Sequence, residues 1–149
     1  MKVLGAGLGI AGLNSVMGAQ AFADIDKKGK HVFVITPGGN DPNRAIFGLL
    51  MAQAIAEKGG GKVYIWMTLD GADLVNKNKT EGIKSPIYKK FGNALEIMKK
   101  VKDRGGRFGV RPPCAEYFGA TGNNKFDWAE LAGGDWLMLN IQDAWVLWI

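Results

Sequence analysis

The 149-residue chain contains a single cysteine, Cys114, and a single histidine, His31. A lone cysteine excludes an internal disulfide framework and any zinc or iron–sulfur site built from several cysteines. A lone histidine excludes two-histidine metal motifs and leaves little general-base chemistry near neutral pH. We therefore expect no metal and no cofactor, and we interpret His31, which opens an apolar run, as a structural residue.

Long apolar runs are also scarce, and charge is nearly absent from the first 23 residues. Lys2 is the only charged residue before Asp24, and Ala21 and Ala23 form the A-x-A pattern that signal peptidase accepts. This predicts a secretory signal peptide over residues 1–23, followed by one domain over residues 24–149 with a net charge of +4. The protein is then periplasmic or secreted, and cytoplasmic if the leader is not cleaved.

Two other interpretations of the same segment remain open. Gly7, Gly9 and Gly12 have the G-x-G-x-x-G spacing of a dinucleotide-binding βαβ unit. However, the strand before them has only four residues, and no acidic residue follows the next strand to hold a ribose hydroxyl. An uncleaved membrane anchor is disfavoured because the apolar run is shorter than the roughly 20 residues of a membrane span. Once the leader is removed, we expect no membrane span.

Predicted strands and helices alternate from residue 30 to the end of the chain. Apolar runs predict buried strands at residues 31–36 and 63–67 and shorter strands at 107–110 and 144–149. Helical spacing predicts helices over residues 44–58, over 87–103 after a Ser-Pro start and with Phe91 facing inward, and within 135–143. This alternation favours an α/β fold with a small, mostly parallel central sheet and helices on both faces.

Three predicted strands are followed by loops, at residues 37–43, 69–73 and 111–114. Ligands and chemistry lie at the carboxyl ends of the strands in such sheets, so the order of elements places Cys114 on the functional edge. Cys114 follows two prolines and opens a helical segment, whose amide groups favour a thiolate together with nearby Arg111. Such a thiolate can carry a persulfide; alternatively, Cys114 is an inert packing residue.

The loop between the first predicted strand and helix also allows two interpretations. Asn40 and Arg44 are suited to hold an anion at the start of that helix. The alternative is ordinary turn chemistry, in which Asp41 or Asn43 caps the helix.

Basic residues are concentrated in one part of the chain. Residues 77–111 hold 11 of the 19 lysines and arginines and carry a net charge of +8, whereas residues 112–149 carry −4. This pattern indicates either a solvated helix face or a docking patch for an acidic partner or an anionic sulfur species. Basic and aromatic residues do not interleave on a strand as in nucleic-acid-binding proteins, so no nucleic-acid partner is expected.

Aromatic residues gather at the other end of the chain. Four of the five tryptophans follow residue 127, and residues 144–149 form an apolar strand. Because bare apolar strand edges aggregate, we expect another subunit to cover this strand in a homo-oligomer.

Four stretches together resemble one family. They are residues 32–45, residues 48–57, residues 63–67 with Asp70-Gly71, and Val110-Arg111-Pro112-Pro113-Cys114-Ala115. Their order is similar to that of the DsrE/DsrF-like family, whose relatives include TusD-type sulfur-relay subunits. The resemblance covers residues 30–149 and implies a flavodoxin-like three-layer sandwich that assembles as a trimer or hexamer. It also implies that Cys114 accepts sulfur and passes it on as a persulfide.

One departure from the family limits the chemistry. Arg111 stands where some relatives have the first cysteine of a C-P-P-C-like pair, and a lone thiol cannot resolve an intramolecular disulfide. Our first hypothesis is therefore a sulfur-relay, sulfurtransferase-like protein that carries a persulfide on Cys114, with Arg111, Arg44 and Asn40 as candidate anion-stabilising residues. Its partners would be a sulfur donor or acceptor protein or a small sulfur compound. The alternative is a non-catalytic oligomeric binding or scaffold subunit.

Overall fold

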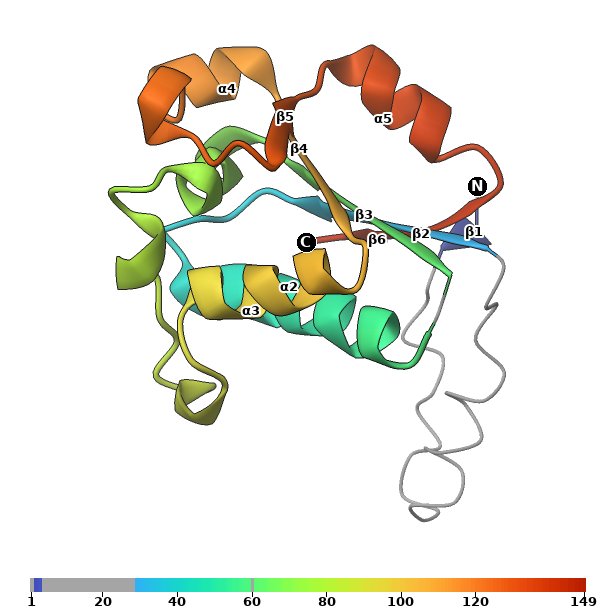
Figure 1. Cartoon of the computed structure of the whole chain (residues 1–149), viewed down its shortest axis with the longest axis horizontal. Helices are drawn as coiled ribbons and strands as arrows, with labels where there is room; N and C mark the ends of the chain where they lie inside the picture. Colours follow the sequence, from blue (N-terminus) through green and yellow to red (C-terminus); the bar gives the residue numbers. More distant parts are fainter. Residues whose placement is uncertain (1, 4–28, 60) are drawn as a thin grey trace.

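A computed structural model of the chain describes residues 2–3, 29–59 and 61–149 (Figure 1). They form one parallel sheet with the strand order β1-β6-β2-β3-β4-β5. The strands are β1 (Lys2–Val3), β2 (Lys30–Ile35), β3 (Lys62–Met67), β4 (Arg107–Val110), β5 (Ala129–Leu131) and β6 (Ala144–Trp148). The predicted parallel α/β sheet is confirmed, with five strands forming its body and β1 adding a two-residue pair at one edge.

Helices lie on both faces of this sheet and complete three layers. The α-helices are α2 (Pro42–Glu57), α3 (Ala94–Asp103), α4 (Pro112–Tyr117) and α5 (Gly134–Asn140). Figure 1 shows α2 and α3 along one face and α5 along the other. Short 3₁₀ turns are η1 (Leu69–Val75), η2 (Thr80–Gly82), η3 (Lys89–Phe91) and η4 (Gly122–Asn124).

The two faces of the sheet bury separate apolar clusters. Alternate residues of a strand point to opposite faces. Phe33 and Ile35 of β2 therefore belong to the larger cluster that includes α2 and α3. Val32 and Val34 belong to the smaller cluster that includes Leu137 of α5. This burial on both faces explains why β2 is apolar at nearly every position.

The predicted start of the helix over residues 87–103 is wrong. In the structure, α3 begins at Ala94, after Gly92 at φ 88°. Asn93 caps α3, because its side chain accepts from the amide of Glu96 while the Glu96 carboxylate accepts from the amide of Asn93. This capping box and the left-handed glycine end the preceding segment, so Phe91 lies outside α3 and is exposed rather than facing inward.

The terminal strand β6 is internal rather than an edge. It lies between β2 and β1, and residues 2 and 3 pair with Trp145 and Val146. The inference of a bare apolar edge is therefore corrected for this part of β6. The homo-oligomer itself stays a prediction.

The predictions for the leader lie mostly outside the described residues. Residues 4–23, which include Gly7, Gly9 and Gly12, are not among them. The described strand β1 pairs with β6 and not with β2, whereas a dinucleotide-binding βαβ unit places its two strands side by side. Within the described ranges, no helix is long and apolar enough to cross a bilayer.

Candidate functional site

The loops after β2, β3 and β4 meet at the carboxyl edge of the sheet, as the order of elements predicts. The amide of Gly71 donates to the carbonyl of Thr36 at 2.7 Å, which joins the first two loops. The amide of Arg111 donates to the carbonyl of Met67 at 3.0 Å, which joins the second and third. The candidate site is therefore one connected surface of three loops.

Cys114 is the third residue of α4 and is half-buried. Pro112 and Pro113 occupy the first two positions and have no amide hydrogen. The amide of Cys114 itself donates to the carbonyl of Arg111 at 3.1 Å. The start of α4 therefore offers no free amide to the sulfur, which corrects the expectation that helix-start amides favour a Cys114 thiolate.

The donor to the sulfur comes instead from the loop after β3. The backbone amide of Leu69 donates to Cys114 Sγ at 3.1 Å, and the Thr68 hydroxyl lies 3.6 Å from the same atom. The loop after β3 thus places a fixed hydrogen-bond donor against the sulfur. The sequence contains no residue-type signal for these contacts, because one partner is a backbone group and both lie more than 40 positions away.

Leu69 makes this contact from an uncommon backbone conformation. Its φ of 52° is positive, and its side chain is 54% exposed. A bulky residue rarely adopts such angles, which cost on the order of 1–3 kcal/mol unless the surroundings impose them. Here Thr68 donates its amide to the carbonyl of Ile35, and Gly71 bonds back to the carbonyl of Thr68. The loop thus holds the Leu69 amide toward the sulfur.

Gly38 is required where the first two loops touch. A Cβ atom at this position would lie 2.0 Å from the carbonyl oxygen of Asp70. That distance is far inside van der Waals contact, so only glycine lets the loop after β2 lie against the loop that carries Leu69.

The C-terminal end of α4 is also hydrogen-bonded to the rest of the domain. The side-chain amide of Asn76 donates to the carbonyl of Phe118 at 3.0 Å, and its oxygen accepts from the amide of Asn78. Asn76 is buried, so these bonds satisfy polar groups that water does not reach. Cys114 is therefore held between a fixed helix and a fixed loop.

The other three candidate residues, Arg44, Arg111 and Asn40, make no hydrogen bond to Cys114 Sγ within the described part of the chain. Arg44 and Arg111 are exposed, and the described residues include no hydrogen bond or ion pair between their guanidinium groups and Cys114. Asn40 accepts from the amide of Gly38 at 2.9 Å, and Asp41 caps α2 by accepting from the amide of Arg44. Turn and capping chemistry thus accounts for this loop, and a role of Arg44, Arg111 and Asn40 toward an anion stays a prediction.

The single histidine does not lie at this edge of the sheet. His31 is buried near the amino end of β2, opposite the end that carries the site, in keeping with a structural role. The described residues contain no cluster of three histidine, cysteine, aspartate or glutamate side chains with metal-ligand geometry.

Comparison with known proteins relates the chain to others through its fold. No family model and no curated protein matches the sequence. Among solved structures, the YchN protein from E. coli superposes with a TM-score of 0.68 at 15% sequence identity, over 81% of this chain and 99% of that one. The chain thus has the three-layer α/β fold of the DsrE/DsrF-like proteins, to which YchN belongs. At this identity the likeness establishes the fold alone.

Proposed function

We propose that the protein is a sulfur carrier, with sulfurtransferase-like chemistry, that holds a persulfide on Cys114. The observation that carries this proposal is the 3.1 Å hydrogen bond from the Leu69 amide to Cys114 Sγ at the carboxyl edge of the sheet. A half-buried thiol with a fixed hydrogen-bond donor is accessible to a small sulfur compound and is held in one position for attack. The DsrE-like fold supports the same interpretation.

The proposed reaction needs no external oxidant. The Cys114 thiolate attacks the sulfane sulfur of a donor persulfide, the donor's S–S bond breaks, and the donor leaves as a thiolate. The outer sulfur of Cys114 is then attacked by an acceptor thiolate, and Cys114 leaves as a thiolate again. The Leu69 amide stabilises the charge that returns to Cys114 Sγ in this second step.

The lack of a second cysteine determines how the sulfur can leave Cys114. No resolving thiol exists in the sequence, so an intramolecular disulfide cannot release it. The sulfur must leave to an acceptor outside the chain, either a protein or a small thiol compound.

Intact mass of the protein from its native host tests the proposal together with export. Purified without reductant, the protein is expected to carry one added sulfur atom that a reductant removes. Its mass is expected to be that of a chain that begins at Asp24. We propose a periplasmic or secreted location on the basis of that cleavage site. A full-length mass with an unmodified thiol would contradict both proposals and favour a binding subunit.

A second candidate function is a homo-oligomeric binding or scaffold subunit. It is favoured by exposed apolar side chains on the α5 side of the sheet: Met138 and Leu139 on the helix, and Trp148 on β6, which is 63% exposed. Trp148 shares the α5 face of the sheet with Val146, two residues earlier on the same strand. Exposed apolar side chains on one face are typical of subunit interfaces.

Sedimentation velocity checks this second candidate. The protein is expected to sediment as a trimer or hexamer, and Met138→Ser with Leu139→Ser is expected to shift it toward the monomer. Lys99→Gln with Lys100→Gln alters exposed residues of α3 instead and should leave the assembly intact. Monomeric wild-type protein at micromolar concentration would contradict the oligomer.

A further inference from the structure

A closed loop projects from the body of the protein between η2 and α3. Lys84 and Asn93 pair as an antiparallel bridge, and the amide of Ala94 donates to the carbonyl of Ile83 at 2.9 Å. The segment between them, which we call the 84–93 loop, therefore leaves and re-enters the fold at one place. Figure 1 shows it extending beyond the end of α3, away from the sheet.

The 84–93 loop is held firmly at its base. The Ser85 hydroxyl donates to the side chain of Asn43 on α2 at 2.7 Å and accepts from the amides of Ile87 and Tyr88. Tyr88 packs against the main core. Because these bonds order the backbone before any partner arrives, docking through this loop costs little conformational entropy.

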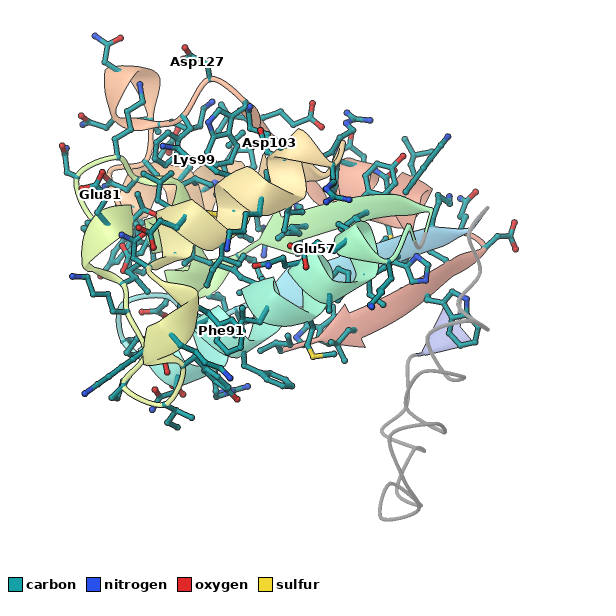
Figure 2. All side chains as sticks on the ribbon, turned by 60° about the horizontal axis from the view of Figure 1, so that its bottom comes forward. Glu57, Glu81, Phe91, Lys99, Asp103 and Asp127 are labelled. Atoms are coloured by element: carbon teal, nitrogen blue, oxygen red, sulfur yellow. The ribbon has the colours of Figure 1, made fainter. Side chains whose placement is uncertain are left out.

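Apolar side chains are displayed on the outer side of the loop. Ile87 is 68% exposed and Phe91 is 37% exposed. Phe47, also exposed, lies one helical turn after Asn43 and so on the side of α2 that bonds the loop. Figure 2 labels Phe91 on this loop, where side chains extend away from the ribbon.

Positive charge surrounds these apolar side chains. Lys84, Lys89 and Lys90 are exposed, and residues 82–95 contain no acidic residue. The next carboxylate, Glu96, is bonded to the amide of Asn93 in the capping box. A pocket of about 260 Å³ opens at the base of the loop, and its lining includes Lys84, Ser85 and Lys89 together with Glu96. The loop therefore combines an apolar tip with a cationic rim.

We propose that the 84–93 loop docks on the surface of an anionic phospholipid bilayer. Ile87 and Phe91 enter the interface between headgroups and acyl chains, while Lys84, Lys89 and Lys90 contact lipid phosphates. Peripheral protein segments bind membranes by inserting apolar side chains and by electrostatic attraction to anionic lipids. A projecting apolar tip can insert into a fluid bilayer, whereas a protein partner must have a pocket of complementary shape. The proposal is independent of Cys114.

Vesicle sedimentation of the purified protein tests this docking. Wild-type protein is expected to bind vesicles of phosphatidylcholine with phosphatidylglycerol and to bind pure phosphatidylcholine far more weakly. Lys89→Gln with Lys90→Gln is expected to weaken binding to the anionic vesicles about 25-fold, about five-fold for each lysine near the surface. Ile87→Ser is expected to weaken it about ten-fold through the loss of buried apolar area.

Matched variants elsewhere on the surface separate the loop from general effects. Tyr117→Ser removes an exposed aromatic side chain from α4, and Lys99→Gln with Lys100→Gln removes the same charge from α3. Both are expected to stay within about two-fold of wild type, because neither change lies on the 84–93 loop and screened charges away from the bilayer contribute little. All variants share the N-terminus of the wild-type protein, so any binding by residues that precede the domain is common to them.

Three outcomes would overturn the lipid assignment. The first is wild-type protein that does not bind anionic vesicles, and the second is equal binding to neutral and anionic vesicles. The third is loop variants that bind as tightly as wild type. Loop-dependent binding of polyglutamate without binding of vesicles would reassign the loop to an acidic protein partner.

Discussion

Cys114→Ser is expected to abolish sulfur loading while leaving the domain folded. Cys114 is the only thiol in the chain, so no other side chain can form the persulfide. Serine keeps the size of the residue and can still accept from the Leu69 amide, so the free energy of unfolding is expected to change by only about 1 kcal/mol. Incubation with inorganic polysulfide followed by intact mass measurement checks the loading, and circular dichroism checks the fold.

Thr68→Val is the matched control for this variant. It removes the hydroxyl that lies 3.6 Å from Cys114 Sγ but leaves both the thiol and the Leu69 amide in place. We expect it to load one sulfur atom, as wild type does. Loading of the Cys114→Ser variant would contradict the persulfide proposal, and so would wild-type protein that takes up no sulfur.

Gly38→Ala is expected to destabilise the domain by about 3 kcal/mol and to slow alkylation of Cys114. The new methyl group would meet the carbonyl oxygen of Asp70 at 2.0 Å, so the loop after β3 has to move. Leu69 precedes Asp70 directly, and its hydrogen bond to Cys114 Sγ is therefore disturbed as well. Urea denaturation gives the change in stability, and the rate of reaction with iodoacetamide gives the change at the thiol.

Gly82→Ala provides the comparison, because nothing lies within 4 Å of the position that its Cβ would take. We expect its stability to stay within about 0.5 kcal/mol of wild type and its alkylation rate to be unchanged. If Gly38→Ala behaved in the same way, the close contact of the two loops would not control the position of the Leu69 amide.

The parts of the fold that follow from local pattern were predictable. The buried strands β2 and β3 appear as apolar runs because both of their faces are covered, and α2 shows its helical spacing and its turn-rich start. The strand β5 was not predicted, because its three residues are too short to carry a period. The start of α3 depends on the backbone angle of Gly92 and on the Asn93–Glu96 capping box. The predicted start lies further upstream, because Ser85-Pro86 also has the pattern of a helix start.

The candidate site was also predictable only in part. The order of elements was enough to place Cys114 on the carboxyl edge, since the loops after parallel strands meet there. The partner of its sulfur was not predictable, because a backbone amide leaves no mark on residue type and Leu69 acts through an unusual φ. The absence of free amides at the start of α4 does follow from Pro112 and Pro113, which cannot donate.

The sequence by itself determined the parallel α/β class, the lone thiol and its edge of the sheet, because apolar period, residue type and element order are local properties of the chain. Only the tertiary structure decided that β6 is internal, that Leu69 donates to Cys114, and that Ile87 and Phe91 stand exposed among lysines. Each of these depends on which distant backbone segments come together. That choice is made by the packing of the whole sheet and its helices, and no single stretch of sequence encodes it.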